Sequence, residues 1–506
     1  MPNTHFLGID LGTSFLKLQV IDAAGAAVAA AGASVPLHVP QPGWVEQDPA
    51  EWWAALRAAC RDLFAPGGVD PASIAAVGLS GQMHGAVFLD SEGAVLRPCL
   101  IWADARTTAQ VGQIAERVPR ATLIGITGNA PNTSFTAAKV LWVQQHEPEI
   151  YARTRHILLP KDYLRLCLTG TYATDVSDAS ATLLFDLARR DWSPVLLAAF
   201  GIDPALLPPV HESTAPTGTI TPEAAAATGL RAGTPVVAGG GDAECSAFGL
   251  GLAGAAGSAG AVLTSIGTSG QVFAVTDRPV IDPRGRIHSL CHVAPDRWHV
   301  MGAILAGGLA LRWLRDILTP PGGPPPDYDA LSAEAALIAA GANGVIFLPY
   351  LQGERTPYMD PQARGVFFGL SRDHTRAHLV RAVMEGVAFA LRDGLEVFRE
   401  LGIAPAEVRV AGGGARSPLW RQIQRDVFAL PVRTIGADHG GAYGAALLAA
   451  VGAGAFAGGA DAARAVPLGA RSAPDPAQVA AYDAVYRRYR RLYPALQAEF
   501  AAASEE

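Results

Sequence analysis

The 506-residue sequence contains very little lysine, no long hydrophobic run and no basic block. Lysine occurs only at Lys17, Lys139 and Lys161, so arginine carries almost all of the positive charge. The net charge of −7, with no acidic tail, argues against nucleic acid as the main partner. No apolar stretch approaches the roughly 18 residues that a membrane span needs, so we expect no membrane partner either.

Paired cysteines and a P-loop are also missing. The five cysteines are dispersed without C-x-x-C spacing, which is typical of buried thiols rather than of disulfides or a zinc site. The first residues lack the basic and apolar regions of a signal peptide, so we expect a cytoplasmic protein. Because no G-x-x-x-x-G-K-[ST] pattern occurs, any ATP would have to be held by other turns.

The tripeptide Gly-Thr-Ser occurs twice in the same setting, at residues 12–14 and 267–269. Each copy follows an apolar run and precedes an alternating one, which predicts a strand, a tight turn and a second strand. Glycine lets a ligand approach the backbone, and hydroxyl and N–H groups can donate hydrogen bonds to phosphate oxygens. The repeat therefore predicts a nucleotide clamped between two related lobes.

Strand-like and helical segments alternate along both halves of the chain, which indicates an α/β fold. A Gly- and Ala-rich segment at 249–257 marks the expected boundary between a domain of residues 1–250 and one of residues 251–506. Strands are expected at 74–80, 156–159, 235–238, 345–349 and 408–411, and helices at 52–64, 243–248 and 377–399.

The end of the chain is less regular. Residues 453–476 form a poorly specified stretch rich in Ala, Gly and Pro. A stripe of tyrosines follows at helical spacing, and we expect it to pack the last helix onto its domain rather than to bind a base. The stripe consists of Tyr482, Tyr486, Tyr489 and Tyr493.

Two aspartates that follow strand-like runs are candidate catalytic groups. Asp10 either stabilises the first turn or holds Mg²⁺ beside phosphates, directly or through water, and the matching turn at 267–269 favours the metal role. Asp242 is expected at the N-cap of a helix, but capping alone does not explain the three glycines before it. A carboxylate so placed can accept the proton of a sugar hydroxyl.

A polar cluster formed by Gln82, Met83 and His84 ends a predicted strand, where ligands gather in α/β sheets. A lone histidine is more often structural, but this combination with glycine suits a polyol pocket. Asp104 lies close by in the sequence. It either adds hydrogen bonds to the same pocket or forms a salt bridge with Arg106, and both interpretations stay open.

Three glycines at 412–414, followed by Ser417, lie between a predicted strand and a predicted helix. A glycine-rich entry to a helix suits phosphate or nucleoside binding, although any tight strand-to-helix turn can use glycine. The polar loop 353–357 follows another predicted strand and is expected near a cleft, without an assigned role.

Taken together, these segments resemble the FGGY carbohydrate kinases over nearly the whole chain and, within that family, most of all the kinases that act on xylulose. Residues 134–146 and 365–385 look like the two signatures of the family. Similar motifs follow the family's order at 44–49, 82–85, 159–164, 239–242 and 353–357. The set is highly specific, whereas any one of these motifs alone is not.

The resemblance implies two ribonuclease-H-like, actin-like ATPase domains with ATP and a sugar in the cleft between them. It implies Mg²⁺-dependent phosphorylation of the terminal hydroxyl of a ketopentose, first of all D-xylulose to D-xylulose 5-phosphate. Asp242 would be the general base, Asp10 the metal-associated carboxylate, and Met83 and His84 sugar contacts. The nucleotide side would be formed by Thr13, Ser14, Lys17, Gly267, Thr268, Gly308, Gly412, Gly413, Gly414 and Ser417.

Three departures from the family pattern lie where a sugar is expected: Ala103, Ala243 and residues 132–134. At positions 103 and 243 the family commonly has an asparagine, and its loss removes a hydrogen-bond donor and an acceptor. A site that lacks a partner for a sugar hydroxyl discriminates differently between sugars. Two alternatives therefore stay open: a kinase of the same class for D-ribulose, an L-ketose or an alditol, and a non-catalytic nucleotide-binding sugar sensor. The formation of a homodimer is also left open.

Overall fold

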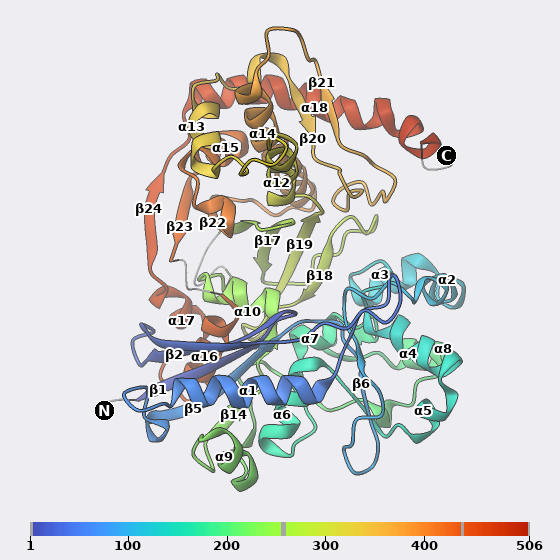
Figure 1. Ribbon diagram of the computed structural model, residues 1–506. Coiled ribbons are helices and arrows are strands. Elements are labelled where there is room, and N and C mark those ends of the chain that lie inside the picture. The colour runs from blue at the N-terminus through green and yellow to red at the C-terminus, as the bar shows by residue number, and fades with distance from the viewer. Residues whose placement is uncertain (1–3, 255–259, 437–439, 504–506) are drawn as a thin grey trace.

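Two seven-stranded sheets, one in each half of the chain, form the centres of two stacked lobes (Figure 1). The computed structural model describes residues 4–254, 260–436 and 440–503. Residues 255–257 of the expected linker lie outside this described part. Among the described helices, none combines the length and the apolar character that a membrane crossing requires.

The first sheet joins an antiparallel unit to parallel strands. Its strands are β1 (His5–Leu11), β2 (Phe15–Asp22), β3 (Ala27–Ser34), β5 (Ile74–Gly81), β13 (Pro216–Thr219), β14 (Pro235–Val237) and β15 (Gly240–Gly241). Their order is β13-β14-β5-β1-β2-β3, with β15 also beside β5. β1, β2 and β3 are antiparallel neighbours, whereas β5 runs parallel to β1, and β14 parallel to β5.

The second sheet repeats this arrangement. Its strands are β16 (Ala261–Ile266), β17 (Gly270–Thr276), β18 (His288–Cys291), β19 (Trp298–Ile304), β22 (Glu407–Ala411), β23 (Val432–Ile435) and β24 (Leu468–Ser472). β16, β17 and β19 are antiparallel neighbours, and β22 and β23 continue from β16 in parallel. The order β3-β2-β1-β5-β14 thus recurs as β19-β17-β16-β22-β23. The predicted pair of ribonuclease-H-like α/β domains is confirmed.

Helix α16 (Gly441–Gly452), from the last part of the chain, covers one face of the first sheet. A Cβ atom on Gly8 of β1 or on Gly78 of β5 would collide with the backbone of α16, so these glycines let the helix lie directly on the strands. Helix α1 (Pro49–Leu63) packs against β2 and β3. Because side chains alternate across a strand, Asp10 lies on the same face as Gly8, next to α16.

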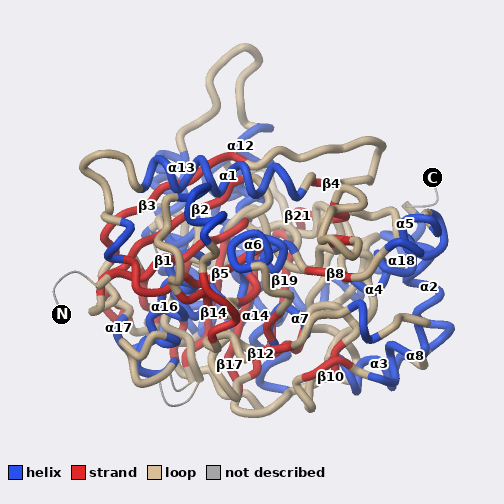
Figure 2. Tube along the Cα trace, turned by 90° about the horizontal axis from the view of Figure 1, so that it is seen from below, coloured by secondary structure: helices blue, strands red, loops and turns tan. Residues whose placement is uncertain are grey.

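A group of helices lies beside the first sheet in both views (Figures 1 and 2). It consists of α2 (Thr108–Arg117), α3 (Arg120–Thr127), α4 (Thr136–His146), α5 (Pro148–Arg153) and α8 (Pro194–Phe200). These helices share their own hydrophobic core, in which Phe135, Leu141 and Leu197 are buried. The group places Phe135, at the start of α4, near the end of β5.

The long helix expected at 377–399 is present as α14 (Arg376–Glu400) and crosses the core of the second lobe. Helix α18 (Pro476–Ala502) buries the four tyrosines of the stripe, as predicted. Tyr486 donates a hydrogen bond to Asp393 of α14 at 2.5 Å. The stretch 453–476 is more ordered than expected, because it contains α17 (Gly459–Ala465) and the edge strand β24.

Candidate active site

Asp10 lies close to the end of β1, where three groups act on its carboxylate. Ser80 of β5 donates a hydrogen bond to Asp10 Oδ1 at 2.6 Å, and Lys17 lies opposite on β2. A Cβ atom on Gly441 would lie only 2.6 Å from Asp10 Oδ2, so the positive N-terminal end of α16 begins at this carboxylate. Burial raises the pKa of Asp10, while Ser80 and Lys17 oppose the rise.

Asp242 is the first residue of α10 (Asp242–Gly249) and follows β15 directly. The predicted N-cap position is wrong, because Gly241 occupies it. β15 pairs with the end of β5 at Ser80, the residue that donates a hydrogen bond to Asp10, so the two aspartates extend from the ends of the two strands β15 and β1 that both pair with β5. Burial, with added repulsion from the Asp10 carboxylate, raises the pKa of Asp242 to about 7, although the N–H of Ala243 lowers it. A carboxyl group that titrates near neutral pH suits a general base.

His84 presents a neutral imidazole to the same region. Its backbone has the left-handed φ of 70°, which is uncommon for a residue other than glycine. Nδ1 lies 2.7 Å from the carbonyl oxygen of Ala181; because a carbonyl only accepts, Nδ1 carries the proton and Nε2 keeps a lone pair. Burial, followed by the charge of Lys139, lowers the pKa of His84 to about 3. Nε2 can therefore accept a hydrogen bond from a hydroxyl group.

Aromatic rings join this histidine to the second lobe. The Phe135 ring lies edge-to-face with His84 at 4.9 Å and with His288 of β18 at 5.8 Å. His288 Nδ1 pairs with Asn129 Oδ1 at 2.9 Å, and burial lowers the pKa of His288 to about 4. Sequence analysis missed Phe135 and His288. Phe135 directly follows residues 132–134, which depart from the family pattern, so the sequence did draw attention to its neighbourhood. No sequence signal singles out His288.

Gln82 supports the first Gly-Thr-Ser turn from behind and is completely buried. Its amide donates to Gln47 Oε1 at 2.6 Å and accepts from the Thr13 hydroxyl at 3.3 Å. Gln47 also donates to the Thr13 carbonyl at 2.7 Å, and Trp102 Nε1 donates to Thr13 Oγ1 at 2.9 Å. Both ends of the Gln82 amide are thus engaged in positioning Thr13, so we leave Gln82 out of the proposed sugar site. Ser14, next along the turn, is exposed.

Asp104 forms the salt bridge that was one of its two interpretations. Its Oδ2 lies 2.8 Å from Arg106 Nη2 and accepts the N–H of Val45 at 2.6 Å. The side chains of Asp104 and Arg106 are 0% and 1% exposed. Since the carboxylate is enclosed by these partners, we leave Asp104 out of the proposed sugar site. Met83, in contrast, packs beside the glycine turn, because a Cβ on Gly241 would lie 2.9 Å from Met83 Cγ.

Three glycine-rich segments meet beyond the end of β16. The exposed turn 267–269 accepts hydrogen bonds from the next segment, since Gly308 N donates to Gly267 O at 2.7 Å and Gly307 N to Thr268 O at 3.0 Å. Gly308 begins α12 (Gly308–Ile317). Gly412 directly follows β22, which pairs with β16, and the turn η4 (Gly413–Ala415) packs against β16. The predicted nucleotide-side glycines therefore lie together.

Two neighbouring polar residues hold these segments in place. Ser417 is the N-cap of α15 (Pro418–Phe428), and its hydroxyl accepts the N–H of Trp420 at 3.2 Å. Glu354, whose role sequence analysis left open, accepts the N–H of Leu305 at 3.0 Å, just before Gly308. Burial raises the pKa of Glu354 to about 8. The Ser417 hydroxyl and the Glu354 carboxylate thus each accept a hydrogen bond from a backbone N–H that lies near one of these glycine segments.

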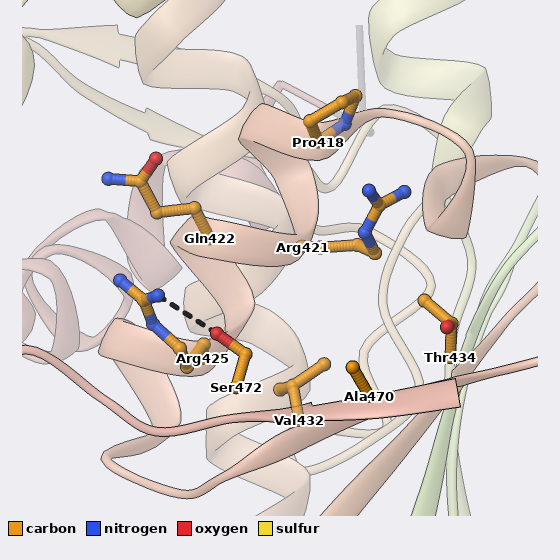
Figure 3. Close-up of a pocket in the computed structure, with 8 residues that line it drawn as sticks. All are labelled: Pro418, Arg421, Gln422, Arg425, Val432, Thr434, Ala470 and Ser472. Atoms are coloured by element: carbon orange, nitrogen blue, oxygen red, sulfur yellow. Dashed lines mark hydrogen bonds between the residues drawn. The ribbon is translucent and has the colours of Figure 1, made fainter. Parts of the chain in front are cut away.

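A separate pocket of about 310 Å³ lies between α15 and the strands β23 and β24 (Figure 3). None of the predicted site residues is among the eight that line it. Arg425 donates to Ser472 Oγ across the pocket at 3.1 Å. Arg421 Nη1 donates to the carbonyls of Ala415 and Arg416, so this arginine stabilises the end of the loop that follows β22.

Comparison with known proteins places this geometry in a family. The model of the N-terminal domain of the FGGY family of carbohydrate kinases matches residues 5–249, and that of the C-terminal domain matches residues 262–453. The chain is 42% identical over 499 residues to the xylulose kinase of Escherichia coli (strain K12), covering 97% of this chain and 99% of that one. It is 40% identical over 494 residues to the xylulose kinase of Klebsiella pneumoniae, with the same coverage. The crystal structure of xylulose kinase from Rhodospirillum rubrum is similar with a TM-score of 0.92 and 34% identity, covering 98% of this chain and 100% of that one. The chain belongs to the FGGY family of carbohydrate kinases.

Proposed function

We propose that the protein transfers the γ-phosphate of ATP to the terminal hydroxyl of D-xylulose, giving D-xylulose 5-phosphate and ADP. The observation that carries this proposal is the buried Asp242, whose pKa is raised to about 7 by burial and, in part, by the Asp10 carboxylate. The strands that carry the two aspartates, β15 and β1, both pair with β5. The similarity to xylulose kinases over almost the whole chain supports D-xylulose as the sugar.

In the proposed reaction, the Asp242 carboxylate accepts the proton of the terminal hydroxyl while the hydroxyl oxygen attacks the γ-phosphorus. The bond from that phosphorus to the oxygen shared with the β-phosphate breaks, and ADP leaves with the electron pair. The neutral His84 Nε2 accepts a hydrogen bond from another sugar hydroxyl and thereby orients the sugar. Backbone N–H groups of the two Gly-Thr-Ser turns and the hydroxyl of Thr268 stabilise the phosphate oxygens, the main requirement of phosphoryl transfer, since the Thr13 hydroxyl proton is already donated to Gln82.

Asp10 is the carboxylate that we propose for Mg²⁺. Among the described residues, no three His, Cys, Asp or Glu side chains are grouped so that they could hold a metal by themselves. A single carboxylate suits Mg²⁺, which usually keeps several waters and binds phosphate oxygens beside one or two carboxylates. When bound, Mg²⁺ would neutralise phosphate charge, while Ser80 and Lys17 hold the Asp10 carboxylate in place.

Replacing Asp10 with asparagine tests this role. We expect the Mg²⁺ concentration for half-maximal activity to rise about 10- to 100-fold, because the change removes the charge that attracts the cation. Mg²⁺ titrations of ADP release measure the effect. Asp22→Asn, at the opposite end of the same hairpin, is the control and should leave the titration unchanged. An unchanged titration for Asp10→Asn would rule out the metal role.

The choice of sugar is tested by an ADP-release screen with ATP and Mg²⁺ over D-xylulose, D-ribulose, L-ketoses and alditols. We expect D-xylulose to give the highest kcat/KM. One observation favours testing other sugars. Ala243 packs in an apolar cluster with Met83, Ala181 and Leu290, so the side chains of this cluster offer no hydrogen bond to a sugar hydroxyl beside Asp242. A higher kcat/KM for another sugar would select that alternative. ATP binding without any sugar-stimulated ADP release would indicate a sensor.

A further inference from the structure

A network of buried charges lies behind the turn that carries Asp242. Lys161 Nζ, on α6 (Pro160–Thr169), lies 2.7 Å from Asp162 Oδ1, 2.8 Å from Asp175 Oδ1 and 3.3 Å from Asp178 Oδ2. Arg165 Nη1 lies 3.2 Å from Asp162 Oδ1. All five side chains are fully buried, so the network is shielded from solvent and its geometry is tightly constrained.

The network reaches the backbone before Asp242 through Arg165 and Ser177. Arg165 Nη2 donates a hydrogen bond to the carbonyl of Ala238. Ser177, on α7 (Val176–Ser180), donates its hydroxyl proton to Asp175 Oδ2 at 2.5 Å. The same hydroxyl accepts the N–H of Gly241 at 3.1 Å. Because a hydroxyl has only one proton, its donation to Asp175 leaves the oxygen lone pairs for Gly241.

The turn has little freedom to find another position. A Cβ on Gly240 would collide with Val293 and would lie 2.9 Å from Ser177 Oγ. The hydrogen bond from the Gly241 N–H to Ser177 Oγ also holds the residue immediately before Asp242, where α10 begins. The position of the Asp242 carboxylate therefore depends on the Ser177 hydroxyl.

We propose that Ser177 is a positioning residue for phosphoryl transfer, which transmits the fixed geometry of the buried charges to the Gly240–Gly241 peptide, immediately before Asp242. This inference rests on the proposed function of Asp242 as the general base. A reacting group that is displaced by about 1 Å costs on the order of 100-fold in rate. Loss of the Ser177 hydroxyl should therefore lower kcat more than it weakens the binding of sugar or ATP.

Ser180 provides a matched control on the same helix. It is a buried serine whose hydroxyl accepts a backbone N–H, that of Cys291, at 3.0 Å. Ser177→Ala and Ser180→Ala each delete the hydroxyl oxygen and one accepted backbone N–H bond, but only the Ser177 bond belongs to the turn before Asp242. Each variant also loses a donated bond, from Ser177 to the Asp175 carboxylate and from Ser180 to the Ser177 carbonyl. Ser177→Ala should lose more thermal stability, because its donated bond goes to a charged group, so kcat measured well below both Tm values reports positioning.

The experiment measures kcat, both KM values and Tm for wild type and variants, with D-xylulose, ATP and Mg²⁺. We expect Ser177→Ala to lower kcat about 10- to 100-fold with both KM values within about twofold of wild type, and Ser180→Ala to keep kcat within about twofold. Ser177→Cys retains the size of the side chain but offers only a weak sulfur acceptor, so it should show the same loss without a cavity.

The outcomes separate the two proposals. Equal kcat in Ser177→Ala and Ser180→Ala, in an active wild type, would overturn the positioning role and leave the proposed function intact. A rise in KM with unchanged kcat would also overturn it. A wild type that releases no ADP with any sugar would overturn the proposed function, and the positioning role together with it.

Discussion

Replacing Asp242 with asparagine should lower kcat by about 10²- to 10⁴-fold, because the amide cannot take the proton of the attacking hydroxyl. ATP should bind nearly as before, since the proposed phosphate contacts come from the glycine segments around Gly308 and from the two threonine turns. Steady-state ADP release measures kcat, and calorimetric titration measures ATP binding. Asp329→Asn, in the exposed first turn of α13 (Tyr328–Ala336), is the control. A variant that keeps more than about a tenth of the wild-type kcat would show that Asp242 is not the base.

The pH dependence of the wild type tests the same assignment. The pKa of Asp242 is raised to about 7, and the base works only when it is ionised, so kcat/KM should fall as the pH falls through about 7. An ordinary aspartate would place this fall near pH 4. A bound cation favours the ionised form, so more Mg²⁺ should move the fall to lower pH. A kcat/KM that stays constant between pH 5 and 8 would contradict the assignment.

Replacing Lys161 with methionine should lower the free energy of unfolding by about 3–5 kcal/mol, because the change leaves buried carboxylates without their shared partner. Burial alone lowers the pKa of Lys161, but the carboxylates of Asp162, Asp175 and Asp178 raise it overall, so the ammonium group stays charged. Burial raises the pKa of Asp178 well above its ordinary value, and without Lys161 the single charge of Arg165 faces both Asp162 and Asp175. Urea unfolding followed by fluorescence and circular dichroism measures the change.

Arg372→Met is the control for this stability prediction. Arg372 and Asp373 form an ion pair at 3.5 Å in which both side chains are almost fully exposed, so water screens their attraction. The urea midpoint of this variant should equal that of wild type. If Lys161→Met unfolds at the same urea concentration as Arg372→Met, the buried network does not stabilise the fold.

Sequence patterns predicted the two α/β lobes because the signals are local. The repeated Gly-Thr-Ser turns and the apolar runs before them define β1 and β16, and helical periodicity defines α14. The position of α16 could not be predicted, because its Gly, Ala and Leu residues form no polar face and the helix is buried on all sides. The order at 453–476 was missed for a similar reason. The Ala- and Gly-rich α17 has little intrinsic signal, and tertiary contacts determine β24.

The site residues also divide into those that local sequence patterns predict and those whose partners are distant in the chain. Asp10, Thr13 and Asp242 belong to glycine turns whose chemistry is visible in the sequence. Gln82 was assigned to the sugar pocket because it lies near a strand end, and for Asp104 this role stayed open beside a salt bridge with Arg106. A polar residue at a strand end can equally support its neighbours. Arg106, the salt-bridge partner of Asp104, is close in the sequence, but other partners are far away in the chain: Gln47 is 35 residues from Gln82, and Val45 is 59 residues from Asp104. Spacing alone does not reveal such pairs.

The three lysines are unrelated in the sequence, but in the folded structure each lies near a residue of the proposed site. Lys17 lies opposite Asp10, Lys139 donates to the carbonyl of His84 at 3.0 Å, and Lys161 joins the buried network behind Asp242. Each is thus linked to one of the three side chains that we propose for catalysis and sugar binding. Lys139 and Lys161 are fully buried, and a slender ammonium group fits such enclosed places, where the broader guanidinium of arginine has more donors to satisfy.

The cover that α16 provides for the first sheet has a consequence for the order in which the protein folds. A ribosome that has released residues 1–250 has made every strand of that sheet, but the surface around Gly8 and Gly78 stays bare until residue 452 emerges. At roughly 5–20 residues per second, this interval lasts roughly 10–40 s. The first lobe to be synthesised is therefore completed only near the end of translation, and its unfinished face is the surface that a chaperone would need to shield.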